Sequence, residues 1–350
     1  MTTTSRSGSA ATDAGGSRPG GIRELARVAG VSITTVSRAL ADHPGIALKT
    51  RERIQQLARE TGYRANPLAS SLRSKKSRTV SVVIALDHDT RQHVSDPFFI
   101  SMVGGVTDAL FERGYELLLS RADRRAPDWP LDMLSTGRSD GLILIGQSYN
   151  HETLNRAAEA GAPMVVWGAA LPDSHYPTVG SDNEGGGYLA TRHLIASGRR
   201  RLAFLGDPDL PEVAARRAGF QRALGEAGLD PAAARYAAVH FEPLQARDEV
   251  AALLAGGLNA DGIVASSDVM AMSAIAALSD AGRRVSEDVA VTGFDDVPSA
   301  AYTTPSLTTV RQDVAAGAER LVDLLMRQLG GEAVTSVELP THLVVRRSAP

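Results

Sequence analysis

The chain has 350 residues, no cysteine, a formal net charge of −3, and 43% hydrophobic and 22% charged residues. This composition is typical of a soluble globular protein, and no apolar run approaches the roughly 18 residues that a membrane span requires. The lack of cysteine excludes disulfides and thiolate metal sites, and the length favours two or three domains over one.

The first 20 residues are small and polar, and they contain no apolar stretch of the kind found in a secretory signal. We therefore expect residues 1–20 to form a disordered, solvated tail. Together with the lack of cysteine, this indicates a protein of the reducing cytoplasm.

Charge is distributed unevenly after this tail. Residues 21–78 contain 12 Lys and Arg against 4 Asp and Glu, whereas residues 79–350 contain 23 Lys and Arg against 35 Asp and Glu. A small basic head on a large acidic body indicates a polyanionic partner for the head alone. The alternative is a basic face that is merely solvated.

The sequence of the basic head, residues 21–78, predicts three short helices. Apolar residues at helical spacing end at about Ala29, and Gly30 gives the backbone freedom that a tight turn requires. A third helix is expected to start with Thr50 as its cap, to bury Ile54, and to stop at Gly62. Three short helices with one tight turn indicate a helix-turn-helix module.

The middle helix is expected to have one buried side and one exposed side. Ser32 is a suitable N-cap, and Val36 and Leu40 fall on one apolar stripe. The exposed side carries Ile33, Thr34, Ser37 and Arg38. A helix in the major groove presents short polar groups and an Arg to the base edges, while surrounding Lys and Arg neutralise phosphates.

Base contacts can be assigned to this exposed side. Arg38 is the candidate for bidentate pairing with guanine, and Ile33 and Thr34 are placed to contact neighbouring bases. The alternative is that these are ordinary exposed residues of a helix.

Five short runs occur in a fixed order between residues 29 and 73: AGVS, TVSR, GYR, NPLA and SLR. In this respect the N-terminus closely resembles that of the lactose/galactose repressor-type (LacI/GalR) family of bacterial transcriptional regulators. The resemblance implies a helix-turn-helix domain at residues 21–65 that binds operator DNA. The DNA contacts that it implies in this domain are Ser32, Ile33, Thr34, Thr35, Ser37 and Arg38.

The resemblance also implies a hinge helix and linker at residues 66–78. NPLASSL matches a segment that becomes helical only on operator DNA, with Asn66, Ala69 and Leu72 as contacts and Leu72 as a wedge in the minor groove. Inserting an apolar side chain between base steps costs a few kcal/mol but gains a bent duplex with more contact. The alternative is that Leu72 belongs to a hydrophobic core, but its neighbours, two Ser before it and the sequence RSKK after it, are polar.

Two hinges must meet at one operator, which implies a homodimer and a pseudo-palindromic site. A dimer is favoured over a tetramer because no leucine-heptad tail follows VVRRSAP. Two departures from the family pattern lie in the head: Ala41 replaces a phosphate-binding Asn, and Ala47 replaces a helix-capping Ser. They predict lower half-site affinity or shifted contacts.

In the body, apolar runs alternate with helical stretches. The runs predict strands buried on both faces, at TVSVVIAL, YELLLSRA, DGLILIG, PMVVWG, RRLAFLGD, DGIVASS and VAVTGFD. The helical stretches are 98–114, 151–161, 184–198, 212–228 and 268–282. This alternation predicts an α/β domain with two parallel sheets, helices on both sides of each, and a ligand cleft at the carboxyl ends of the strands.

The resemblance continues through the body, in runs such as DPFF, RRAGF, SSDVM, GFDD and TPSLTTVRQD. It implies a two-subdomain fold like that of the type I periplasmic binding proteins for residues 79–350. The chain is expected to cross between subdomains near Asp182, Leu307 and Gly331. The N-subdomain would then hold about 79–182 and 308–331, and the C-subdomain about 183–307 and 332–350.

The resemblance assigns Arg216 and Asp268 to effector binding, since Arg and Asp hold vicinal hydroxyls from opposite sides beside an aromatic face. The other expected effector residues are Asp96, Phe98, Trp167 and Asp295. Asp295 could instead be an acid with a structural role only. Trp167 could instead be a residue of the core or of an interface. Ser267 replaces an Asn common before the Asp, which alters the geometry there.

Metal-binding and nucleotide-binding signatures are missing from the sequence. The eight His are scattered, no HExxH or GxxxxGK[ST] is present, and the GGG at residues 185–187 lacks dinucleotide-binding spacing. Asp295 and Asp296 are adjacent and would point to different sides, unlike an acid-base pair. We expect neither catalysis nor a cofactor or metal, although a fold alone does not exclude an enzyme.

These patterns predict an allosteric repressor of carbohydrate uptake and catabolism genes, controlled by a mono- or disaccharide in the cleft. Ligand and operator would be coupled by about 1–3 kcal/mol. One alternative keeps DNA binding but assigns control to a nucleobase or a protein corepressor. A remote alternative is a solute-binding protein or an enzyme.

Overall fold

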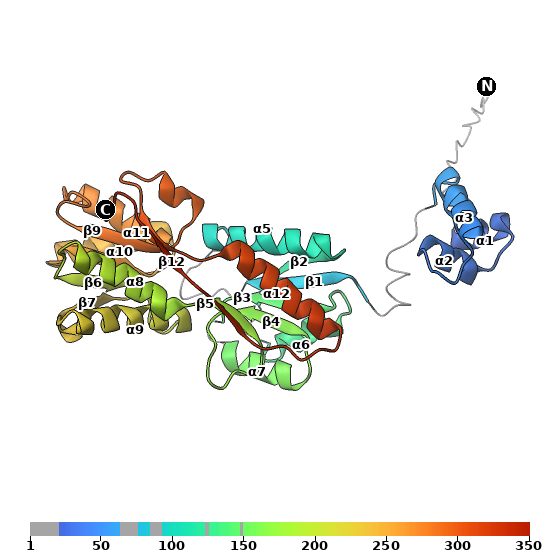
Figure 1. The fold of residues 1–350 in the computed structure, drawn as a ribbon, viewed down its shortest axis with the longest axis horizontal. Coiled ribbons are helices and arrows are strands. Elements are labelled where there is room, and N and C mark those ends of the chain that lie inside the picture. The colour runs from blue at the N-terminus through green and yellow to red at the C-terminus, as the bar shows by residue number, and fades with distance from the viewer. Residues whose placement is uncertain (1–20, 64–75, 85–92, 123–125, 148–149) are drawn as a thin grey trace, which may run out of the picture. The chain divides into compact units, whose positions relative to one another are not determined.

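The computed structural model describes residues 21–63, 76–84, 93–122, 126–147 and 150–350 (Figure 1). The chain divides into two compact units, residues 1–75 and 76–350, and the division falls inside the expected linker. The expected tail and the hinge residues Asn66, Ala69 and Leu72 lie outside the described residues, so they stay predictions. None of the described helices is long and apolar enough to cross a membrane.

The first unit has three helices in its described part, α1 (Ile22–Ala29), α2 (Ile33–Leu40) and α3 (Leu48–Glu60). The expected turn is confirmed, because Gly30 adopts a left-handed φ of 64° directly after α1. Leu25, Val36 and Ile54 are almost fully buried and join the three helices into one core. The helix-turn-helix prediction is therefore confirmed.

The predicted start of α3 is wrong. Thr50 lies inside the first turn of the helix, where its backbone N–H donates to the carbonyl of Ala47 at 2.9 Å. The N-cap is Ala47, which has no side chain to accept a bond from the first turn. The departure at position 47 therefore leaves this helix without a side-chain cap, which in other proteins is worth about 1 kcal/mol.

The second unit contains two six-stranded sheets in its described part. The first has the order β11-β5-β4-β3-β1-β2 and the second the order β12-β10-β9-β8-β6-β7. All pairs are parallel except β10 with β12. The strands of the first sheet are β1 (Thr79–Ile84), β2 (Glu116–Arg121), β3 (Gly141–Ile145), β4 (Met164–Trp167), β5 (Thr178–Ser181) and β11 (Val337–Leu339). Those of the second are β6 (Leu202–Leu205), β7 (Arg235–Ala237), β8 (Gly262–Ala265), β9 (Ala290–Asp295), β10 (Thr308–Arg311) and β12 (His342–Val344).

Helices cover both faces of the first sheet. Val80 and Val82 of β1 pack on the side of α5 (Pro97–Glu112) and α12 (Val314–Leu329), whereas Val83 packs on the side of α6 (Trp129–Ser135) and α7 (His151–Glu159). This alternation follows the two-residue period of a strand. The sheet is thus the buried middle layer that the sequence predicts.

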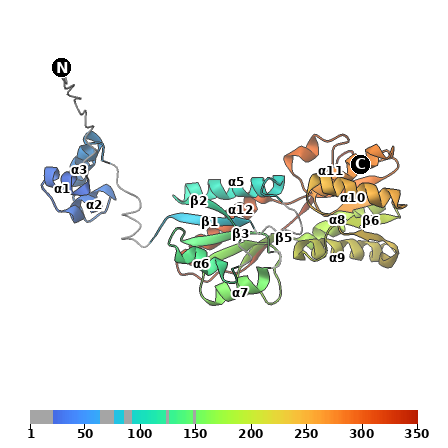
Figure 2. The same ribbon diagram turned by 180° about the vertical axis from the view of Figure 1, so that it is seen from behind.

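The second sheet is covered in the same way (Figure 2). Helix α8 (Asn183–Ala196) pairs with α9 (Pro211–Glu226), and α10 (Pro243–Ala255) pairs with α11 (Asp268–Asp280). Gly187 and Gly219 let α8 and α9 approach closely, because a Cβ at Gly219 would lie 1.9 Å from the Glu184 carbonyl oxygen. This close approach positions the residues of α9 that face the cleft.

All seven expected strands are present, but one expectation about them is wrong. β2 is an edge strand rather than one buried on both faces, and its Leu118 and Leu119 are 37% and 44% exposed. The sequence reasoning missed the short strands β5, β7, β10, β11 and β12 and the helices α6, α10 and α12.

The chain changes subdomain at three places, two of which differ from the prediction. The first change falls at Asp182, as expected, between β5 and α8. The second falls after Arg311 rather than near Leu307, and the third falls after Leu339 rather than near Gly331. The reason is that β10 completes the second sheet and β11 completes the first, so each crossing is delayed by one short strand.

Candidate functional site

The exposed side of α2 is the candidate DNA-reading surface. Ser32 and Thr35 serve the helix itself, because the Ser32 hydroxyl oxygen accepts the Thr35 backbone N–H at 3.1 Å and lies 2.9 Å from the Thr35 hydroxyl. Ile33 is 40% exposed, and Thr34 and Arg38 are also exposed. Arg38 makes no side-chain hydrogen bond or ion pair with the part of the chain that the structure describes. Its guanidinium is thus available for a base edge.

Some of the basic residues near α2 have structural partners instead. Arg53 donates to the carbonyl of Ala29 at 2.8 Å, which satisfies the C-terminal end of α1. Arg51 donates to the carbonyl of Asp42 at 2.9 Å and so holds the loop after α2. These arginines position the reading helix within the module.

A cavity of about 90 Å³ lies between the two sheets of the second unit, at the carboxyl ends of their strands. It is lined by Asp96, Phe98, Phe99, Gly146, Gln147, Trp167, Leu210, Glu212, Val213, Arg216, Phe241, Ser267, Asp295 and Gln312. Both subdomains contribute, which is the position where open α/β sheets bind ligands.

Arg216 on α9 is held rigidly at this cavity. Its Nε donates to the Asn183 side-chain oxygen at 2.9 Å, its Nη1 donates to the Ser266 carbonyl, and its guanidinium stacks 3.7 Å above the Phe294 ring. A Cβ at Gly187 would lie 2.1 Å from the Arg216 carbonyl oxygen, so close helix packing fixes its backbone as well. A preorganised guanidinium suits a ligand that offers hydroxyl or carboxylate oxygens.

Asp295 stands at the end of β9 with an unusual backbone. Its φ is 117° and that of Asp296 is 56°, which non-glycine residues rarely adopt. The Gln312 amide donates to the Asp295 carboxylate at 2.6 Å. Burial raises the pKa of Asp295 to about 7, and the charge of Asp96 adds to this, whereas Arg216 opposes it. The strand end therefore presents a carboxyl group that is partly protonated at neutral pH.

Asp96 and the aromatic residues form the facing wall. Asp96 caps α5 by accepting the Phe98 N–H at 2.9 Å, and burial raises its pKa. The rings of Phe98 and Trp167 lie 6.1 Å apart and are tilted by 45°. These rings offer the apolar surface against which the C–H face of a small polar ligand packs.

Gln147 faces the cavity at the end of a hydrogen-bonded chain. Its amide nitrogen donates to the Tyr176 hydroxyl at 3.2 Å, and that hydroxyl lies 2.7 Å from Nδ1 of His151. Nε2 of His151 lies 3.0 Å from the Asp173 carboxylate. The amide oxygen of Gln147 also accepts the Ala169 N–H at 3.0 Å, so the orientation of this amide is fixed from both ends.

Asp268 does not line the cavity, contrary to the expectation. It is fully buried behind Asp295, where its carboxylate accepts the Thr309 hydroxyl at 2.5 Å and the Val297 N–H at 2.8 Å. Ser267, one residue earlier, lines the cavity and caps α11. Asp268 therefore supports the strand end that carries Asp295 rather than facing a ligand.

Comparison with known proteins agrees with this arrangement. The model of the bacterial regulatory proteins of the lacI family matches residues 21–66, and that of the periplasmic binding protein-like domain matches residues 191–349. The transcriptional regulator CelR of Thermobifida fusca is 32% identical over 332 residues, which cover 93% of this chain and 96% of CelR. The transcriptional repressor PurR of Haemophilus influenzae (strain PittEE) is 27% identical over 338 residues, which cover 93% of this chain and 98% of PurR.

The chain belongs to the LacI family of bacterial transcriptional regulators.

Solved structures show the same fold for this LacI-family regulator. The CelR–cellobiose complex superposes with a TM-score of 0.70 at 31% identity and covers 95% of this chain and 100% of CelR. The lac repressor dimer bound to operator and the anti-inducer ONPF superposes with a TM-score of 0.83 at 24% identity and covers 95% and 99%. The predicted fold class, a helix-turn-helix domain with a two-sheet binding domain, is confirmed.

The structure brings together five of the six expected effector residues of the regulator: Asp96, Phe98, Trp167, Arg216 and Asp295. It adds five charged, amide or aromatic residues that sequence reasoning missed: Phe99, Gln147, Glu212, Phe241 and Gln312. The run TPSLTTVRQD, which carried part of the resemblance, already contained Gln312. No comparable signal marked Glu212, because its place in the cavity depends on how α9 packs.

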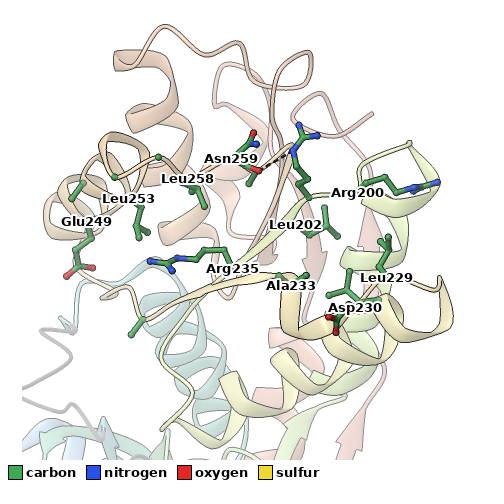
Figure 3. A pocket seen from close by; sticks show the side chains of 18 residues that line it. Arg200, Leu202, Leu229, Asp230, Ala233, Arg235, Glu249, Leu253, Leu258 and Asn259 are labelled. Carbon is green, nitrogen blue, oxygen red and sulfur yellow. Dashed lines mark hydrogen bonds between the residues drawn. The ribbon is translucent and has the colours of Figure 1, made fainter.

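A larger hollow of about 790 Å³ lies at the opposite, amino-terminal ends of β6, β7 and β8 (Figure 3). Arg200, Arg235, Asp230 and Glu249 surround a group of leucines there. None of the residues expected at a ligand site lies in it. The smaller cavity is the better effector site of this regulator because it combines convergent polar groups, shifted pKa values and contributions from both subdomains.

Proposed function

We propose that this LacI-family regulator is a repressor whose affinity for operator DNA is controlled by a small sugar bound in the cavity between its subdomains. The observation that carries the proposal is the convergence of Arg216, Asp295 and two amides beside the rings of Phe98 and Trp167. Directional hydrogen-bonding groups around an apolar surface are what a polyol requires. The related CelR was solved in complex with cellobiose, which supports the same class of effector.

The test is a titration of operator binding by the full-length protein against a panel of mono- and disaccharides. A sugar that changes operator affinity by at least about five-fold, the lower end of allosteric coupling, supports the proposal. If no saccharide changes either operator affinity or the melting temperature, sugar control is wrong.

We further infer that the repressor acts as a homodimer on a pseudo-palindromic operator. Phe111 on α5 is 81% exposed, and Leu119 on the adjacent edge strand β2, which pairs with Val82 on the α5 side of the sheet, is 44% exposed. Exposed apolar side chains that gather on one face are typical of a subunit interface. Sedimentation of the wild type and of Phe111→Glu tests this, since the substitution is expected to favour monomers and weaken operator binding.

A nucleobase is the second candidate effector. Four aromatic side chains, Phe98, Phe99, Trp167 and Phe241, line the cavity, and Gln147 and Gln312 provide amides that could pair with a base edge. Adenine, guanine and hypoxanthine in the same titration discriminate between the candidates. A shift caused by a purine, with none caused by any saccharide, would replace the sugar proposal. Both candidates describe a protein that acts by binding, in keeping with a family of transcriptional regulators.

A further inference from the structure

The cavity carries more negative than positive charge. Asp96, Glu212 and Asp295 line it, whereas Arg216 is the single basic side chain among its described lining residues. None of the three carboxylates has an ion-pair partner within 4.0 Å in the part of the chain that the structure describes. With a neutral sugar bound, this excess could be lowered only by protonation of the acids, in keeping with the raised pKa of Asp295.

Arg216 compensates only part of this excess. Its Nε and Nη1 already donate to Asn183 and to the Ser266 carbonyl, and one face of the guanidinium is covered by Phe294. Electrostatic attraction connects it to Asp295, Glu212 and Asp268, so one cation is shared among three acids. Asp96 lies near enough to Asp295 for the two carboxylates to repel each other.

Glu212 is the most informative of the three acids. It lies in the first turn of α9 in the second subdomain and lines the cavity together with Gln147 and Trp167 of the first subdomain. Its carboxyl group is therefore placed where the two subdomains meet. Burial raises the pKa of Glu212, as it does for Asp96 and Asp295. Burying three acids around one cavity is costly unless a positive charge arrives with the ligand.

The remaining lining suits a small ring. The cavity of about 90 Å³ is far smaller than the 300–1,000 Å³ usual for sites that enclose drug-sized ligands. Phe98, Trp167 and Phe241 supply aromatic faces, and such faces attract a cation as well as C–H groups. The ligand that satisfies both the charge and the size is a monosaccharide with an amino group.

We propose that the effector is an amino sugar whose ammonium group lies among Glu212, Asp295 and Asp96, while Arg216 and the amides of Gln147 and Gln312 bind its hydroxyls. This inference rests on the proposed sugar control and specifies the class of sugar. It distinguishes the regulator from its relative CelR, whose bound cellobiose carries no charge.

The experiment compares matched sugars with the full-length protein by calorimetry at about pH 6.5, where the amine is protonated. The pairs are D-glucosamine with D-glucose and D-galactosamine with D-galactose, and each N-acetylated form removes the charge but keeps the nitrogen. We expect one amino sugar to bind at least about ten-fold more tightly than both its neutral partner and its N-acetyl form, because the charged contact is made in a site shielded from water.

Two variants test whether the preference for an amino sugar depends on Glu212. Glu212→Gln should bring the ratio of amino-sugar to neutral-sugar affinity towards one, whereas Glu226→Gln, at the far end of the same helix and outside the cavity, should leave the ratio at its wild-type value. If a neutral sugar binds as tightly as its amino counterpart and alters operator affinity, the amino-sugar inference is overturned while sugar control stands. If no saccharide of any kind binds, both proposals fail.

Discussion

The close approach of α8 and α9 makes Gly219→Ala a sharp test of how the effector site is built. An added Cβ would lie 1.9 Å from the Glu184 carbonyl oxygen and 2.6 Å from the Tyr188 nitrogen, both of which are helix backbone. An ordinary contact requires about 3.4 Å or more, so the helices must separate by roughly 1.5 Å. Overpacking of this kind costs about 1–3 kcal/mol or more, and the better helix propensity of Ala returns at most about 1 kcal/mol.

The net loss should therefore be about 2 kcal/mol in the free energy of unfolding, which corresponds to about 4–8 °C in Tm for a unit of this size. Urea denaturation and thermal melting measure it. Gly225→Ala is the matched control, because Gly225 lies on the same helix and no atom lies within 4 Å of its added Cβ. The control should be neutral or slightly stabilising. A Gly219→Ala protein as stable as the wild type would refute this account of the helix contact.

Three further substitutions have defined outcomes. Arg38→Ala should cost about 1–3 kcal/mol of operator binding and relax specificity at one base pair, as measured by competition with operators mutated at each position; a uniform loss on every sequence would instead identify a phosphate contact. Tyr176→Phe should lower the free energy of unfolding by about 1 kcal/mol in urea, because Gln147 loses one of its two acceptors and His151 loses its contact with the hydroxyl; an unchanged value would show that the chain from His151 to Gln147 contributes nothing. Asp295→Asn should raise the Tm of the ligand-free protein at pH 8 but not at pH 4. The folded pKa of about 7 lies above the unfolded value, so the stability that protonation of Asp295 contributes is complete at low pH and is lost as the pH rises through 7. An equal effect at both pH values would contradict the pKa shift.

The large elements were predictable from the sequence because their periodicity depends on local residues alone. The helix α2 follows from Ser32 as its cap and Val36 on its buried side, and β3 follows from an uninterrupted apolar run. β7 and β11 were missed because strands of three residues carry no period of their own. They exist because a neighbouring strand supplies the hydrogen bonds. Two chain crossings were misplaced because β11 and the equally short β10 were missed.

The effector site was predictable to the extent that its residues stand at the ends of strongly apolar strands. Asp295 stands at the end of such a strand, whereas Arg216 lies on α9 and was assigned by the resemblance to the family. The sequence did not show which of Ser267 and Asp268 lines the cavity, because successive side chains at a helix start point to different sides. The structure shows that Ser267 lines the cavity and that Asp268 packs against Thr309 in the core. Glu212 was missed for a related reason, since the residues that line the cavity with it, such as Gln147 and Trp167, lie far away in the sequence on the other subdomain.

The crossings between the subdomains differ in the hydrogen bonds that they make. The backbone N–H of Asp182 donates to the Leu339 carbonyl at 2.9 Å, so the first and third crossings continue the β5–β11 ladder as one tied ribbon. The second crossing begins at Gln312, whose amide is bonded to Asp295 inside the cavity. A ligand that competes for this amide would therefore contact a residue at which the chain passes from one subdomain to the other.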